Sequence, residues 1–303
     1  MPELVLFHYD LSPFSEKVRA MLGYAGLDWY SAKVSEMPPR PVLDLLTGGY
    51  RKIPVAQIGA DVYCDTRTIA RQIARLGNCP SLILEDQPED VQAFVARTDL
   101  DIFLACVIAA SDLKMLRSLV RQTSLLHTLK FLKDRITMGR KARVRPVRGP
   151  EAKQTVLNHM ADMEQRLTED FLFGATPCIA DFSAYHGLWF VCDLAGKPWL
   201  RDYPKVASWM ARMRAFGHGQ PTELTAEAAL EMARSAQPVA LPDADGKAEG
   251  IGRTVVVAPT DYGLDPVRGR LVYEGPNERI LARETPETGL VHVHFPVQGF
   301  SVS

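Results

Sequence analysis

The first 25 residues change from a strand pattern to a helix pattern within a few positions. An apolar run, Leu4 to Phe7, ends in polar turn residues. After this turn, apolar side chains follow the spacing of a helix with one buried face: Phe14, Val18, Met21, Leu22 and Ala25. Ser12 stands at the N-cap position and Pro13 at the first helical position, where a missing N–H has no cost. The sequence therefore predicts a hydroxyl at a helix N-terminus, which stabilises anions, thiolates included.

Further strand and helix patterns follow and complete a small α/β unit. An extended segment at 28–34 makes the opening strand, helix, strand, a crossover that places two strands in parallel. The later elements are a short helix at 42–46, hairpin strands at 52–58 and 62–64, and a helix over 65–74. The predicted order is βαβ followed by αββα.

Three motifs in this unit resemble a known family. They are Ser12-Pro13-Phe14-Ser15 after the first strand, Lys52-Ile53-Pro54-Val55 opening the third, and Asp65-Thr66 opening the last helix. In this order and spacing they resemble the thioredoxin-like domain of the cytosolic glutathione S-transferases, in their serine-type form. The resemblance implies glutathione as co-substrate, no metal and a homodimer.

The resemblance also implies roles for individual residues. Ser12 is expected to donate a hydrogen bond to the glutathione sulfur and favour the thiolate, with Tyr9 and Ser15 as back-up hydroxyl donors. The glutathione-binding residues it implies are Phe14, Lys52, Ile53, Pro54, Asp65 and Thr66. Members with cysteine at the position of Ser12 transfer thiols through a mixed disulfide, which a serine does not form.

Each motif also has a purely structural reading. Ser12 and Asp65 fit plain N-caps, and His8 fits a structural histidine in a strand. Ile53-Pro54 is a candidate cis peptide that frees the Ile53 backbone to pair with an extended peptide, or an ordinary rigid turn. The pair Asp65-Thr66 also replaces the Glu-Ser that is common in the family, with a side chain one methylene shorter.

Composition limits the class of protein. The chain has 303 residues, long enough for two or more domains, and a formal net charge of -1. Its 47% hydrophobic and 23% charged residues give no sign of a nucleic-acid partner, and no run is long enough to span a membrane. Five scattered cysteines without a Cys-x-x-Cys pair, and an N-terminus unlike a secretory signal, predict a cytoplasmic protein with reduced thiols.

After a turn-rich linker, the chain is predicted to be helical from about residue 89 to residue 235. Cys178 occupies a cap position that is normally Ser or Thr in the family, and Asp181 is predicted to be a structural capping residue. Candidates for a second-substrate pocket are Phe103, Cys106, Val107 and Met115. A basic stretch between 130 and 148 is either a rim that attracts anions or a solvated surface.

The last part of the chain has a different pattern. A Pro- and Gly-containing linker at 238–252 precedes β-branched runs at 253–257, 269–273, 279–283 and 290–295. We expect a small antiparallel sheet that packs against the helical domain or a partner subunit. His292 and His294 lie on one face of a strand, a spacing that can ligate a metal, and the sequence shows no third ligand beside them.

The predicted fold is therefore α/β plus all-α. It comprises a thioredoxin-like domain at 1–78, a helical bundle of glutathione-transferase type at 88–236 and an antiparallel β extension at 250–303. The predicted function is activation of the glutathione thiol for attack on a small hydrophobic or anionic electrophile. The alternatives are a glutathione-dependent isomerase, dehalogenase or disulfide reductase, and a non-catalytic binding or scaffold protein that retains the fold.

Overall fold

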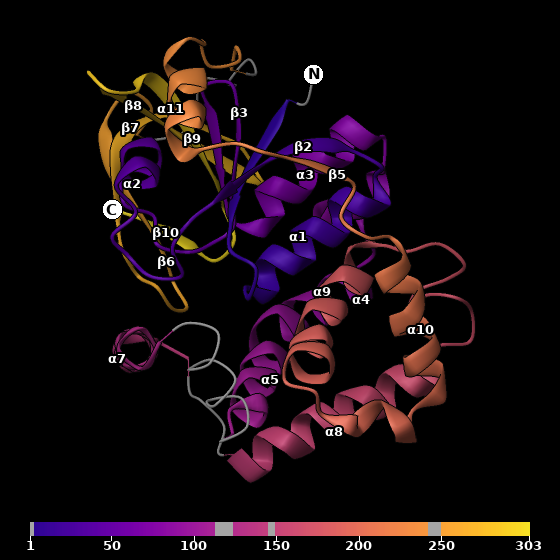
Figure 1. Cartoon of the computed structure of the whole chain (residues 1–303). Coiled ribbons are helices and arrows are strands. Elements are labelled where there is room, and N and C mark those ends of the chain that lie inside the picture. The colour runs from indigo at the N-terminus through magenta and orange to yellow at the C-terminus, as the bar shows by residue number, and fades with distance from the viewer. Residues whose placement is uncertain (1–2, 113–123, 145–148, 242–249) are drawn as a thin grey trace.

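The computed structural model describes residues 3–112, 124–144, 149–241 and 250–303 (Figure 1). The thioredoxin-like unit has the predicted order of elements: β1 (Leu4–His8), α1 (Pro13–Tyr24), β2 (Asp28–Lys33), α2 (Pro41–Thr47), β3 (Val55–Ile58), β4 (Asp61–Cys64) and α3 (Thr66–Gly77). β1 runs parallel to β2 and antiparallel to β3, and β3 pairs with β4 as a hairpin. The crossover through α1 explains the parallel pair.

Helices dominate the middle of the chain, as the sequence predicts. They are α4 (Glu89–Arg97), α5 (Phe103–Ala110), α7 (Leu125–Lys141), α8 (Gly149–Arg166), α9 (Ile179–Leu188) and α10 (Pro204–Ala215), with 3₁₀ turns at Pro80–Leu82, Leu84–Asp86 and Pro198–Asp202 and π-helical segments at Thr98–Ile102 and Trp189–Leu194. Every residue of α9 is buried. Asp181 in its first turn accepts hydrogen bonds from the Cys178 and Leu172 N–H groups and from Trp209 Nε1. The capping role predicted for Asp181 is confirmed.

The C-terminal extension does not pack as we expected from the sequence. It forms β6 (Thr254–Pro259), β7 (Val267–Glu274), β8 (Glu278–Thr285), β9 (Gly289–Pro296) and β10 (Phe300–Val302). β9 pairs in parallel with β4, so the extension continues the thioredoxin-like sheet. The result is one ten-stranded sheet of order β10-β6-β7-β8-β9-β4-β3-β1-β2-β5. Without the extension, the side of β4 away from β3 would have unpaired backbone groups. β9 pairs with these groups, which a small separate sheet would leave unpaired.

Two elements near the end of the helical region also belong to this sheet layer. β5 (Gln220–Glu223) pairs in parallel with β2 at one edge. α11 (Ala226–Arg234) lies against α2 and the sheet, and the Ala229 carbonyl accepts a hydrogen bond from the buried Gln57 amide. The chain thus returns from the helical domain to the sheet before the extension begins (Figure 1).

Two hydrophobic cores lie on opposite faces of the sheet. Leu4 and Leu6 join α1, α3 and the helical domain in the first core. Val5 and Phe7 face the other way, into a second core with α2, α11 and the extension. The alternation of side chains along a strand explains how β1 serves both cores.

His292 and His294 face this sheet junction. His294 Nε2 lies 2.8 Å from Asp61 Oδ1, and its Nδ1 lies 3.4 Å from Glu278. Burial alone would lower the pKa of His294, but its hydrogen bonds to Asp61 and Glu278 raise it above the ordinary value. The described residues contain no group of three or more His, Cys, Asp or Glu side chains suited to a metal ion. His294 therefore joins the extension to the thioredoxin-like unit through Asp61, and His292 Nδ1 lies 3.9 Å from the same carboxylate oxygen.

Within the same described ranges, no helix has both the length and the apolar character needed to cross a membrane.

Candidate functional site

Ser12 lies at the turn between β1 and α1, where the sequence predicts it. Its Oγ accepts a hydrogen bond from the Ser15 N–H at 3.1 Å, so Ser12 is the N-cap of α1. A hydroxyl that accepts this bond still has its own hydrogen to donate. The residue is 2% exposed, so the surrounding side chains shield it almost completely from solvent. Capping the helix and donating to a ligand are therefore compatible for one side chain.

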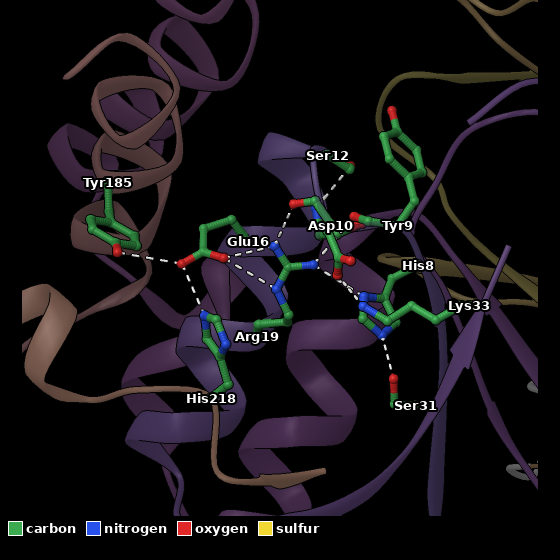
Figure 2. Close-up of polar contacts among 11 residues, drawn as sticks. His8, Tyr9, Asp10, Ser12, Glu16, Arg19, Ser31, Lys33, Tyr185 and His218 are labelled. Carbon is green, nitrogen blue, oxygen red and sulfur yellow. Dashed lines mark hydrogen bonds and ion pairs between the residues drawn. The ribbon is translucent and has the colours of Figure 1, made fainter. Parts of the chain in front are cut away.

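A buried charge network holds the turn that contains Ser12 (Figure 2). Arg19 donates to the backbone carbonyls of Tyr9 and Asp10, at 3.3 and 3.1 Å. The same guanidinium pairs with Glu16 at 2.7 Å and contacts His8 Nδ1 at 3.0 Å. Burial, followed by the positive charge of Arg19, lowers the pKa of His8 to about 3, so His8 is neutral. This network fixes the backbone that positions Ser12.

Glu16 extends the network into the helical side of the molecule. Its second carboxylate oxygen lies 3.4 Å from the Tyr185 hydroxyl and 3.0 Å from His218 Nε2 (Figure 2). Burial alone would raise the pKa of Glu16, but the hydrogen bond from His218 and the charge of Arg19 lower it. The ionised Glu16 therefore links α1 to α9 and to the segment before β5.

The predicted tripeptide-binding segments lie side by side. Val55 pairs with Cys64, which brings Ile53-Pro54 next to Asp65-Thr66 at one end of the β3–β4 hairpin. The Ile53–Pro54 peptide bond is cis. None of the described residues hydrogen-bonds to the Ile53 backbone N–H or carbonyl. These two groups are available to an extended peptide.

Asp65 closes this end of the hairpin as the N-cap of α3. Its Oδ1 accepts a hydrogen bond from the Arg67 N–H at 3.0 Å. Asp65 has φ 82°, in the region that residues other than glycine adopt rarely and at a cost. Thr66 follows as the first helical residue and is 8% exposed. A ligand carboxylate at this position would meet the N–H groups and dipole of α3.

Lys52 already has a partner from the extension. Its Nζ lies 2.6 and 2.9 Å from the two carboxylate oxygens of Asp261, and 4.2 Å from the centre of the Tyr262 ring. Asp261 and Tyr262 lie between β6 and β7, more than 200 residues from Lys52 in sequence. Lys52, which the resemblance predicts to bind glutathione, therefore forms an ion pair within the protein.

The other predicted site residues differ in access. Phe14 packs against Phe103 and His186, with ring centres 4.5 and 4.7 Å apart. The Tyr9 side chain is partly exposed and points away from the Glu16–Arg19 network (Figure 2). Ser15 is fully buried and its Oγ has no hydrogen-bond partner among the described residues; this burial argues against contact between Ser15 and a ligand.

The candidates for a second-substrate pocket divide in the same way. Phe103 and Val107 are partly buried, and Phe103 lies next to Phe14. Cys106 is completely buried beside Gly187, so it belongs to the core and not to a pocket wall. Met115 lies outside the described residues.

Lys17 and Asp99 form a buried ion pair at 2.7 Å between α1 and the helical domain.

The basic stretch includes α7, which contacts the loop regions beside Lys52. Arg51 forms an ion pair with Asp134 of α7. Arg135 donates to the Glu36 carbonyl at 2.7 Å, and His127 lies 3.3 Å from the Glu36 carboxylate. Part of the stretch is therefore a docking surface inside the molecule; Arg145 and Arg148 lie outside the described residues.

The comparisons with known proteins agree with this fold. A family model for the glutathione S-transferase N-terminal domain matches residues 6–80, and one for the C-terminal domain matches residues 143–212. A GST-like protein from Pseudomonas syringae has 36% sequence identity and a TM-score of 0.80, over 100% of this chain and 99% of that chain. The chain belongs to the glutathione S-transferase family.

Other solved members of the family are similar in fold alone. Glutathione transferase F7 from Populus trichocarpa has 15% identity and a TM-score of 0.50, over 70% of this chain and 93% of that chain. The Pseudomonas syringae protein also matches across the C-terminal extension, because its alignment covers all of this glutathione S-transferase family member. No curated protein matches the chain.

Sequence reasoning missed Asp261 and Tyr262, which approach the site from the extension. Neither belongs to a motif, and a lone Asp-Tyr pair in a turn has no distinctive pattern. Asp134, within the basic stretch, likewise has no motif that marks it as the partner of Arg51. Their roles depend on long-range docking, which a local pattern does not reveal.

Proposed function

We propose that this glutathione S-transferase family member activates the thiol of glutathione for attack on a small hydrophobic or anionic electrophile. The observation that supports this most is the position of Ser12. Its hydroxyl is at the N-terminus of α1, which follows the end of β1. The pairing of Phe7 with Val55 puts that end of β1 at the same end of the sheet as Ile53, whose backbone pairs with none of the described residues, and as Asp65 and Thr66, which open α3. This arrangement provides a hydrogen-bond donor for sulfur and a backbone edge for a peptide.

In the proposed reaction, the Ser12 O–H donates a hydrogen bond to the glutathione sulfur and stabilises the thiolate. The partial positive charge at the N-terminus of α1 acts in the same direction. The thiol proton leaves to solvent. The sulfur electron pair then forms a bond to the electrophilic carbon, and the leaving group departs with its own electron pair. The electrophile approaches from the side of Phe14 and Phe103.

The strained backbone of Asp65 gives a second line of support. Residues held at unfavourable φ values are concentrated at ligand-binding positions, where the surrounding structure enforces them. Asp65 caps α3 and adjoins Thr66, which in this proposal binds the γ-glutamyl end of glutathione.

Steady-state conjugation of glutathione with an aryl halide tests the proposal. Ser12→Ala is expected to lose roughly 10²-fold in turnover, the usual cost of one lost donor to a developing anion. Because this change also removes an N-cap, Thr225→Ala is the matched control: Thr225 caps α11 through the Ala228 N–H at 3.1 Å, far from Ser12 in the chain. Thr225→Ala is expected to retain full turnover.

Full activity in Ser12→Ala would contradict the assignment and move it to Tyr9, which Tyr9→Phe then tests.

A non-catalytic binding protein is the second candidate, and the Lys52–Asp261 ion pair favours it. That pair occupies one of the residues expected to bind glutathione, and Ser12 is only 2% exposed. This candidate predicts weak or absent binding of glutathione and no turnover in any variant. Homodimer formation and a cytoplasmic location remain predictions; size-exclusion chromatography with light scattering measures the oligomeric state.

A further inference from the structure

The loop between β6 and β7 returns to the thioredoxin-like unit at Lys52. Both carboxylate oxygens of Asp261 bind Lys52 Nζ, and the side chains of the pair are only 15% and 28% exposed. Two backbone contacts hold Asp261 in place. Its Oδ1 accepts from the Tyr262 N–H at 2.6 Å, and its carbonyl accepts from the Arg143 N–H at 2.8 Å. Asp261 is therefore a fixed partner of Lys52 and not a loosely tethered surface charge.

Tyr262, the next residue of the same loop, also lies beside a residue of the proposed glutathione site. Its ring centre is 4.2 Å from Lys52 Nζ. Burial, followed by the nearby carboxylates of Asp261 and Asp65, raises the pKa of Tyr262 well above the ordinary value for a phenol. Asp65 caps α3 beside Ile53-Pro54, at the same end of the hairpin as Lys52, so the loop lies near both Lys52 and Asp65.

The positions of Asp65, Ile53 and Lys52 define the two ends of the tripeptide in the proposed complex. A γ-glutamyl carboxylate at the N-terminus of α3 and a cysteinyl unit on the Ile53 backbone leave the C-terminal glycyl group toward Lys52. This group meets a cation that Asp261 already neutralises. A glycyl carboxylate would also lie near the Asp261 carboxylate, and like charges that are partly desolvated repel strongly.

The neighbouring arginines are already engaged. Arg40 donates to the backbone carbonyls of Ser35, Glu36 and Arg51, at 2.8, 3.0 and 2.7 Å. Arg51 forms its ion pair with Asp134. These guanidinium groups have carbonyl or carboxylate partners in place, so neither substitutes directly for Lys52 as the receptor of a glycyl carboxylate.

We propose that Asp261 is a specificity residue that makes the site favour a glutathione-type thiol whose C-terminal glycyl carboxyl is masked as an ester or amide. This rests on the proposed function, because it assumes a thiol tripeptide at the Ser12 site. The extension thereby supplies a residue to the substrate site of the thioredoxin-like unit.

Calorimetric titration with glutathione and with its glycyl monoethyl ester tests the proposal on the full chain. The variants are Asp261→Asn, which frees the charge of Lys52, and Asp265→Asn as a control in the same loop. Among the described residues Asp265 forms no ion pair. Thermal unfolding of each variant checks that the fold is retained.

The wild-type protein is expected to bind the ester at least as tightly as the free acid. Asp261→Asn is expected to shift the preference toward the free acid by roughly tenfold, and Asp265→Asn to behave as wild type. An equal preference for the free acid in wild type and Asp261→Asn would overturn this proposal alone. Absence of binding by both ligands in every variant would overturn it together with the proposed function.

Discussion

Replacing Phe295 by alanine tests whether the extension and the thioredoxin-like unit fold as one body. Phe295 lies on β9 and is completely buried. Its ring is 5.9 Å from that of Tyr50 and 5.5 Å from that of Phe300, centre to centre. A buried phenylalanine truncated to alanine costs about 3–5 kcal/mol, from lost transfer free energy and the cavity that remains. This is a large share of the roughly 5–15 kcal/mol that stabilises a typical domain.

The location of this cost is the informative part. β9 pairs with β4, and the second core contains Val5, Phe7 and Val62 as well as Phe295. We therefore expect native-state hydrogen exchange at β3 and β4, as well as β8 and β9, to become roughly 10²- to 5 × 10³-fold faster in Phe295→Ala. Val302→Ala is the control, because Val302 is 37% exposed and its truncation is expected to cost less than about 0.5 kcal/mol.

Faster exchange confined to β6–β10, with β3 and β4 unchanged, would refute the reasoning. In that case the extension would open as a separate unit, and the β4–β9 pairing would contribute little to the stability of the thioredoxin-like sheet.

Three further predictions concern buried polar groups. Asp181→Ala is expected to cost at least about 3 kcal/mol in urea unfolding, because it leaves the buried N–H groups of Leu172, Cys178 and Trp209 without an acceptor; a loss within error of wild type would contradict this. The folded-state pKa of His8, about 3, lies below its ordinary 6.5. The contribution of neutral His8 to folding stability is therefore present above pH 6.5 and is lost as the pH falls toward 3. In His8→Asn, the melting temperature is expected to fall less steeply over this range, and an unchanged slope would exclude His8 as a source. The pKa of His294 is raised above 6.5 in the folded protein, so its contribution to folding stability is complete below pH 6.5 and is lost as the pH rises through the folded-state pKa. His294→Gln is expected to flatten the alkaline side of the plot of melting temperature against pH. An unchanged alkaline slope in this variant would contradict the assignment.

Local signals were enough to predict most of the thioredoxin-like unit. The apolar run before Ser12, the proline after it and the helical spacing from Phe14 are all patterns within one short, continuous segment of the sequence. The same applies to Asp65, which caps α3 as the N-cap reading predicts. These elements are specified by neighbours in sequence, and a single sequence contains that information.

The docking of the extension depends on partners that are far apart. Alternation in residues 290–295 identifies a buried strand but not the strand beside it, and His294 meets Asp61 across 233 positions. β5 was missed for a different reason: Gln220 to Glu223 are exposed and polar, so no period-2 apolar pattern marks them. The motif around Lys52 predicted that this residue binds glutathione. Asp261, the partner that neutralises its charge, lies on the extension.

The central claim is that Ser12 stabilises a thiolate of bound glutathione. The most direct measurement is calorimetric binding of glutathione combined with a pH titration of the bound thiol by its ultraviolet absorbance. We predict binding to the wild-type protein with a thiol pKa below neutral, against about 8.5 for a free cysteine thiol, and a raised pKa in Ser12→Ala. No binding at millimolar glutathione, or a bound thiol whose pKa is the same with and without the Ser12 hydroxyl, would contradict the account.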